Sequence, residues 1–177
     1  MEIKEHRHRG FCGIGIYGSK FSENAGTLWR SSLILGADFT FVIGKRYKEM
    51  PSDTCKSWRH IPMFEFKAFE DFLCSLPKGA SLIGVELDPR SISVTTYKHP
   101  ERAVYLLGAE DSGLPQYILG RCDDIIQIPA SISLNVAVAG SIVLYDRNVK
   151  SRANVYNFLV NRFDGRGYDI RGRTVLL

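Results

Sequence analysis

The segment best suited to holding a ligand is residues 107–115 (LGAEDSGLP). It follows a continuous apolar run, and open parallel sheets bind their ligands beyond the carboxyl ends of the strands. Gly108 and Gly113 would let backbone amides come close to a ligand, and Glu110 and Asp111 would place negative charge there. A helix start capped by Asp111 or by the serine after it explains the same residues. This segment alone leaves both alternatives open.

A second segment, residues 128–139 (IPASISLNVAVA), passes from a strand through small residues into an apolar helix. Ser133 is suited to cap that helix. Asn135 lies near the start of the helix, and a polar amide facing a core needs hydrogen-bond partners. We therefore expect Asn135 either to hold a loop in place or to belong to a binding site.

A third segment, residues 23–30 (ENAGTLWR), carries an asparagine and an arginine six positions apart. Asn24 is placed to cap a helix expected over residues 25–35, and Gly36 is placed to end it. Arg30 lies inside that helix. A helix cap followed by a surface arginine accounts for this segment taken alone.

The elements that must position these segments alternate between strands and helices. Strands are expected over residues 11–17, 38–43, 61–66, 81–86, 103–107 and 124–128, and helices over 25–35, 69–76 and 134–147. Two of the strands are continuously apolar, as in strands buried on both faces of a parallel sheet. The pattern predicts an α/β domain, a parallel sheet with helices on both faces.

Three glycines match the spacing of the dinucleotide-binding fingerprint. They are Gly13, Gly15 and Gly18, and Asp38 follows about 20 residues on. That motif needs a strand before its first glycine, whereas these glycines lie inside the first strand, which only the polar residues 1–10 precede. We reject the nucleotide-binding interpretation and expect the glycines to thin the strand for close packing.

The composition is that of one globular domain, with 45% hydrophobic and 24% charged residues. No apolar run approaches the ~18 residues of a membrane span, and the charged start lacks the apolar stretch of a secretory signal. We expect a cytoplasmic protein whose four cysteines are reduced and mostly buried, without a zinc site because none forms a C-x-x-C pair. The net charge of +4 permits nucleic-acid binding without requiring it.

Taken together, the three segments resemble the motifs of the SpoU family of RNA methyltransferases, within the SPOUT superfamily. Residues 23–30 resemble the family's N-x-G-x-x-x-R motif, residues 107–115 its G-x-E-x-x-G-L-P motif, and residues 128–139 its I-P…S-L-N-V motif. The motifs occur in the family's order and are spread over residues 11–149. One motif would be weak, whereas three in order are specific.

The resemblance implies a C-terminal trefoil knot, formed by the segments around Gly108 and residues 128–135, although chains rarely knot. It also implies a homodimer, with the apolar helix 134–145 as partner surface because Val136, Val138, Gly140, Ile142 and Val143 leave it little polar face. The implied cofactor is S-adenosylmethionine, bound in the knot largely through backbone groups. By position, its binding residues would be Val85, Gly108, Ile128, Ser133, Leu134 and Asn135.

The implied activity is methyl transfer to a ribose 2'-hydroxyl of RNA, an in-line displacement that needs no metal. The resemblance assigns Arg30 the activating role, usually across the dimer interface, and brings Asn24 and Glu110 into the catalytic group as positioning residues. Arginine stays protonated in proteins. We therefore expect Arg30 to orient the hydroxyl and an adjacent phosphate and to stabilise the forming alkoxide, rather than to act as a base.

The chain resembles the short family members, several of which modify tRNA with the catalytic domain alone. We expect a basic arm at residues 1–10, the knotted methyltransferase domain at 11–149 and a C-terminal helix or basic tail at 150–177. The expected RNA-binding residues are Arg7, Arg9, Arg46, Lys56 and Arg59. Basic groups beside an aromatic such as Trp58 suit phosphate contact and base stacking, although a solvated basic surface explains any one cluster equally.

Several functions remain open on the sequence. A tRNA substrate is preferred, and ribosomal RNA is the near alternative. A non-catalytic RNA-binding protein of the same fold is a second class, but a retired site has no chemical reason to keep Arg30, Glu110 and Asn135 together. A different α/β nucleotide enzyme would need the context that the glycine motif lacks.

Overall fold

The computed structural model describes residues 10–18, 22–44, 51–109 and 111–150. Their strands are β1 (Phe11–Tyr17), β2 (Phe39–Ile43), β3 (Met63–Phe66), β4 (Ser81–Val85), β5 (Ile92–Ser93), β6 (Arg102–Leu107) and β7 (Asp124–Gln127). Their helices are α1 (Ser22–Ile34), α2 (Phe69–Ser75), α3 (Gln116–Leu119) and α4 (Val136–Lys150), with a 3₁₀-helix η1 (Ser57–Arg59). The expected arm and tail lie, apart from Gly10 and Lys150, outside the described residues.

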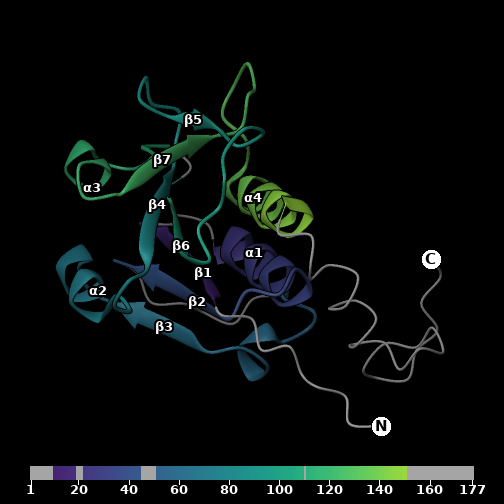
Figure 1. The fold of residues 1–177 in the computed structure, drawn as a ribbon. Helices are drawn as coiled ribbons and strands as arrows, with labels where there is room; N and C mark the ends of the chain where they lie inside the picture. The colour runs from purple at the N-terminus through teal and green to yellow at the C-terminus, as the bar shows by residue number, and fades with distance from the viewer. Residues whose placement is uncertain (1–9, 19–21, 45–50, 110, 151–177) are drawn as a thin grey trace, which may run out of the picture.

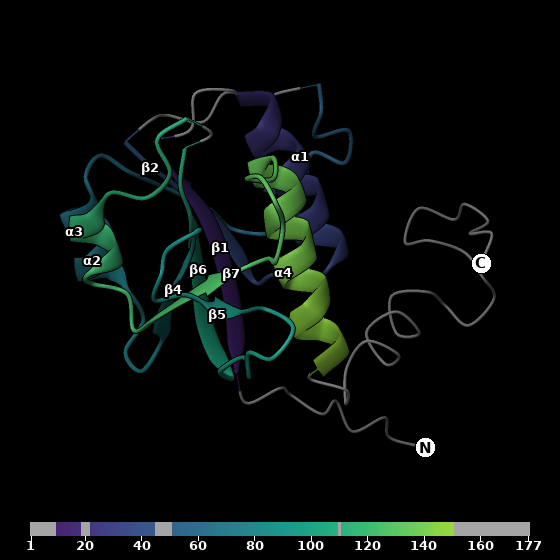
Figure 2. The same ribbon diagram turned by 90° about the horizontal axis from the view of Figure 1, so that it is seen from above.

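The strands form one parallel sheet in the order β3-β2-β1-β6-β4-β7-β5. Helices α1 and α4 lie side by side on one face, and α2 and α3 cover the other (Figures 1 and 2). The predicted architecture of a parallel sheet with helices on both faces is therefore confirmed. No helix in the described part of the chain is long and apolar enough to cross a membrane.

Every expected strand and helix is present, with bounds that differ by at most three residues. Strand β5 and helix α3 were not expected, because two and four residues are too short to show a hydrophobic period. The prediction that Asn24 caps the first helix is wrong. Helix α1 begins at Ser22, so Asn24 lies within its first turn. Gly36 does follow the end of α1, with a positive φ of 78°.

Each face of the sheet carries its own apolar core. The α1/α4 core packs Leu28 and Val143 against Ile14, and Gly140 allows α4 to approach α1 because a Cβ there would lie 2.5 Å from Leu28 Cδ1. The α2/α3 core includes a stacked pair, Phe41 and Phe72, whose ring centroids are 4.6 Å apart. Burial on both faces explains why the central strands are continuously apolar.

The glycines of β1 make room for aromatic rings of the neighbouring strand. A Cβ on Gly13 would lie 2.2 Å from the ring of Phe39, and one on Gly15 would lie 2.4 Å from the ring of Phe41. The prediction that the glycines thin the strand for packing is confirmed for Gly13 and Gly15. It is wrong for Gly18, which follows β1, has a φ of +67° and would place a Cβ 3.9 Å from the Cβ of Ala109.

All four cysteines are free, as expected, but most are not buried. Only Cys12 is buried; Cys55 and Cys122 are half-buried and Cys74 is exposed. Burial raises the pKa of the Cys12 thiol to about 12. This thiol therefore stays protonated and unreactive at neutral pH.

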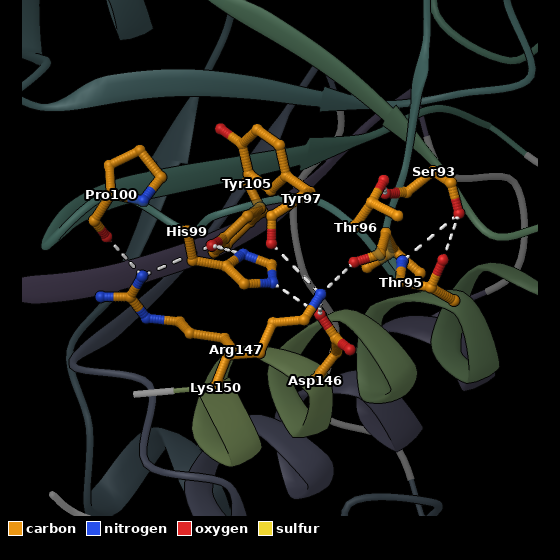
Figure 3. A network of polar contacts seen from close by, with 11 residues as sticks. Ser93, Thr95, Thr96, Tyr97, His99, Pro100, Tyr105, Asp146, Arg147 and Lys150 are labelled. Atoms are coloured by element: carbon orange, nitrogen blue, oxygen red, sulfur yellow. Dashed lines mark hydrogen bonds and ion pairs between the residues drawn. The ribbon is translucent and has the colours of Figure 1, made fainter. Parts of the chain in front are cut away.

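A polar network ties the end of α4 to the loop before β6 (Figure 3). His99 Nε2 lies 2.9 Å from Asp146 Oδ2, and His99 Nδ1 lies 2.6 Å from the Tyr105 hydroxyl. A carboxylate only accepts, so Nε2 of the neutral ring donates to Asp146, and Nδ1 accepts from Tyr105. Lys150 Nζ lies 2.7 Å from the same Asp146 oxygen, and Arg147 donates to the backbone oxygen of Glu101 at 2.9 Å.

We expect the stability of the protein to fall as the pH drops through His99's ordinary pKa of 6.5. Burial lowers the pKa of His99 in the folded state, while the nearby Asp146 opposes that shift and Arg147 and Lys150 add to it. Below pH 6.5 the unfolded chain therefore binds a proton that the folded chain does not, so unfolding becomes easier. Thermal melting at pH 7.5 and 5.5 tests this. The decrease in Tm from pH 7.5 to pH 5.5 should be smaller in His99→Gln than in the native protein. An equal decrease in that variant would contradict the assignment to His99.

Candidate functional site

A cavity of about 250 Å³ lies beyond the carboxyl ends of β6, β4 and β7, which are neighbours in the sheet. Open parallel sheets bind ligands at this edge. Five of the six expected cofactor-binding residues line the cavity: Val85, Gly108, Ile128, Ser133 and Leu134. The sixth, Asn135, does not line it, although Leu134 and Val136 on either side do. Residues far apart in sequence thus meet in one hollow.

A tight turn between Gly108 and Gly113 forms one wall of the cavity. Gly113 donates its backbone N–H to Ala109 O at 2.9 Å, and its φ is +62°, in the left-handed region that favours glycine. A Cβ on Gly108 would lie 2.2 Å from the carbonyl carbon of Gly113. The alternative of a helix start capped by Asp111 is wrong, because α3 begins only at Gln116.

Glu86 organises this turn, and sequence analysis missed it. Its Oε2 accepts the backbone N–H of Leu114 at 2.7 Å, and its Oε1 accepts that of Leu87 at 2.9 Å. Glu86 itself lines the cavity. The available signal was an acidic residue directly after a buried strand, a place where a sheet has no structural need of charge.

Asn135 joins the start of α4 to the start of α1. Its Oδ1 accepts the backbone N–H groups of Ala137 and Val138 at 2.9 and 3.4 Å, and its Nδ2 donates to Asn24 Oδ1 at 2.9 Å. The amide has hydrogen-bond partners as expected, but the expectation that it faces the core is wrong, because the Asn135 side chain is exposed. The cap of α4 is Asn135, so the expectation that Ser133 caps this helix is wrong.

Removing this amide should destabilise the protein. We expect Asn135→Ala to lower the free energy of unfolding by ~1–2 kcal/mol, the usual effect of losing a helix cap, and to lower Tm by roughly 2–4 °C per kcal/mol. Asn135→Asp keeps the cap oxygen but loses the donor to Asn24, so it is the matched control. If calorimetry gives both variants the same loss, the bridge rather than the cap supplies the stability.

The structure does not place Arg30 in the cavity. Arg30 is exposed on α1, where it shares an outward stripe with Glu23, Thr27 and Ile34 at helical spacing. Asn24 lies on the same helix and contacts Asn135. Glu110, expected in the catalytic group, lies outside the described residues, as do Arg7, Arg9 and Arg46.

The remaining expected RNA-binding residues, Lys56 and Arg59, lie on an exposed loop beside α1. Arg59 Cζ is 4.8 Å from the centroid of the Trp58 ring, a cation–π contact. The buried Asp53 shapes the loop by accepting the Ser57 N–H at 2.8 Å and the Ser57 hydroxyl at 2.6 Å. The two basic residues lie beside an exposed aromatic and do not line the cavity, and their contact with RNA stays a prediction.

Comparison with curated proteins identifies relatives that act on tRNA. The chain is 29% identical over 146 residues to a tRNA (guanosine(18)-2'-O)-methyltransferase of Borreliella burgdorferi, covering 79% of this chain and 67% of that protein. It is 30% identical over 144 residues to a tRNA (cytidine(34)-2'-O)-methyltransferase of Ancylobacter novellus, covering 74% and 87%.

Among solved structures, an AdoMet-bound rRNA methyltransferase from Sinorhizobium meliloti has the same fold. The TM-score is 0.70 at 23% identity, and the match covers 78% of this chain and 56% of that one. The model of the SpoU rRNA Methylase family matches residues 14–145, a span that contains the whole sheet except the start of β1, together with the cavity and both helix starts joined by Asn135. The chain belongs to the SpoU methylase family.

Proposed function

We propose that the protein is an S-adenosylmethionine-dependent RNA 2'-O-ribose methyltransferase of the cytoplasm, with tRNA as its preferred substrate. The observation that carries this proposal is the cavity beyond β6, β4 and β7, lined by residues from both cofactor motifs. The two curated relatives are named for 2'-O-methylation of tRNA. The rRNA methyltransferase among the structural neighbours supports ribosomal RNA as the second candidate.

The walls of the cavity fit a cationic and partly aromatic ligand such as S-adenosylmethionine. Glu86 and Asp111 supply carboxylates, and Ile128 and Leu134 supply apolar surface. The turn at Gly108 is so close-packed that backbone rather than side chain faces a ligand there. The volume of about 250 Å³ is close to the lower end of the ~300–1,000 Å³ of small-molecule sites. When bound, this cofactor supplies the methyl group on a positively charged sulfur.

The knot forms part of the same proposal. The segments around Gly108 and residues 128–135 are separated in sequence by α3 and β7, yet both line one cavity. Such a juxtaposition is what a C-terminal segment threaded past the loop at Gly108 would give. It supports the knot expected from the family, in spite of the general rarity of knots.

Homodimerisation is supported by an apolar hollow of about 360 Å³ between α1 and α4. Not every residue expected on the partner surface is available, because Val136, Gly140 and Val143 are buried in the chain's own core. Val138, Ile142 and Tyr145 do line the hollow, and Val138 and Tyr145 are 47% and 61% exposed.

The catalytic role proposed for Arg30 fits this dimer. Thr27 lines the hollow, and Arg30 is the next residue along the same stripe of α1. A second copy seated on α1 and α4 would therefore bring Arg30 to the interface. There its guanidinium could orient the ribose hydroxyl and a phosphate in the partner's site, with Asn24 and Glu110 as positioning residues.

The test is methyl transfer from radiolabelled S-adenosylmethionine to total tRNA and, separately, to ribosomal RNA, each with and without EDTA. Label in tRNA as a 2'-O-methylnucleoside, unaffected by EDTA, is the expected result. No group of three or more metal-ligating side chains comes together within the described ranges. Cofactor binding without label in either RNA would favour the non-catalytic RNA-binding alternative.

RNA contact by the loop beside α1 is tested separately with the double variant Lys56→Ala/Arg59→Ala. The slope of log affinity against log salt is negative, and each lost phosphate contact should reduce its magnitude by about one. Lys67→Ala/Lys78→Ala, which removes two exposed cations near α2, is the matched control. Equal slopes in the two double variants would remove Lys56 and Arg59 from the proposed RNA surface.

A further inference from the structure

Glu86 lines the cavity, so its carboxylate can contact a bound ligand as well as hold the turn. It directly follows β4, which lies between β6 and β7 in the sheet, and so stands at the centre of the edge where the cavity opens. Its carboxylate touches the turn closely enough that a Cβ on Gly113 would lie 2.4 Å from Oε2. The Glu86 carboxylate therefore packs directly against Gly113, and a side chain at position 113 would clash with it.

The carboxylate retains acceptor capacity after these contacts. An ionised carboxylate offers about four lone-pair sites and donates nothing. The N–H groups of Leu87 and Leu114 take one site on each oxygen. Both contacts come from backbone N–H groups, and within the described ranges of the chain no cationic side chain forms an ion pair with Glu86. What remains is a fixed negative group, with a free lone pair on each oxygen, at the wall of a hollow.

We infer that Glu86 binds the cofactor directly, accepting a hydrogen bond from an O–H or N–H donor of S-adenosylmethionine while it holds the Gly113–Leu114 turn. The inference rests on the proposed function. The adenine amino group is a neutral donor, whereas the donors that a carboxylate favours are the ribose hydroxyls, as in dinucleotide sites, and the cationic α-ammonium group; the inference is confined to these two. A negative acceptor also favours a cationic ligand, and charge-assisted hydrogen bonds are about twice as strong as neutral ones.

The test is a thermodynamic cycle between Glu86→Gln and ligands that lack one donor. Calorimetry would measure the binding of S-adenosylhomocysteine, of 5'-methylthioadenosine, which lacks the amino-acid part, and of its 2'-deoxy and 3'-deoxy forms. We expect Glu86→Gln to weaken binding of S-adenosylhomocysteine about tenfold. We also expect the loss caused by removing one donor to shrink several-fold in the variant, because interacting groups are not additive.

The truncated ligand that loses less affinity in Glu86→Gln than in the native protein identifies the donor as a hydroxyl or the ammonium group. If every truncation weakens binding equally in the native protein and in Glu86→Gln, Glu86 only shapes the turn and the inference is overturned. If the native chain binds none of these ligands, the proposed function fails with it. Glu101→Gln, an exposed carboxylate at the amino end of the sheet, is the matched control. Glu86→Asp, which keeps the charge, carries the same cycle if the glutamine variant does not fold.

Discussion

Arg30→Ala should lower the rate of methyl transfer by about 10²–10³-fold, the usual effect of losing one donor that stabilises an oxyanion, without weakening cofactor binding. Arg30 is exposed on α1 and does not line the cavity, so its removal leaves the cofactor's walls intact. Single-turnover assays with saturating RNA and cofactor measure the chemical step. Retained single-turnover methylation in the variant would exclude Arg30 from catalysis.

Two further variants sharpen this experiment. Arg30→Lys keeps the positive charge but loses the planar fork of donors, so it should recover only part of the rate if the guanidinium orients both a hydroxyl and a phosphate. Arg102→Ala removes an exposed arginine at the amino end of β6, the opposite edge of the sheet from the cavity, and should leave the rate unchanged. A slow Arg102→Ala variant would point to general loss of RNA attraction instead.

The architecture could be predicted because strands that are buried on both faces of a sheet are continuously apolar in sequence. Strands such as β4 and β6 are continuously apolar, and α4 is apolar over most of its length. The short elements β5 and α3 carry no such signal, since their bounds depend on contacts with β7 and on the turn after Pro115. The sequence-based start of α1 was late because Asn24 is a good capping residue in isolation, while its oxygen is committed to Asn135 111 residues away.

The resemblance to the family's motifs, rather than the strand pattern, selected Gly108, Ile128 and Ser133, and the structure brings all three to one cavity. Their binding of the cofactor stays a prediction, and residues that act through distant partners were not found. The sequence pattern does not reveal Glu86 because its carboxylate accepts a hydrogen bond from Leu114, which lies 28 residues further along the chain. Arg30 shows the opposite case: its residue type suggests chemistry, but the structure places it on the exposed side of α1, outside the cavity.

The largest expected effect on cofactor binding comes from one methyl group at Gly108. A Cβ there would lie 2.2 Å from Gly113 C and 2.4 Å from Leu114 N, and these are backbone atoms that cannot swing aside. The turn must open, which disturbs the cavity wall and the contact of Leu114 with Glu86. Overpacking of this kind costs about 1–3 kcal/mol, so we expect Gly108→Ala to bind S-adenosylhomocysteine roughly 5- to 150-fold more weakly. Calorimetric titration measures this directly.

Gly120→Ala is the control, because its φ of −68° suits alanine and the nearest atom to its Cβ would be 3.4 Å away. Native affinity in Gly108→Ala would show that the turn is pliable and does not define the site.

The two variants with the largest effects, Arg30→Ala and Gly108→Ala, can also be combined in one experiment. If Arg30 serves the partner's cavity, mixing Gly108→Ala with Arg30→Ala should restore activity at a cofactor concentration too low to fill the Gly108→Ala cavity, because each mixed dimer assembles one complete site. Random exchange makes half of the dimers mixed, so about a quarter of the native sites should be complete. Mixing that restores nothing, although subunit exchange is demonstrated, would place Arg30 and the cavity of the same chain in one active site.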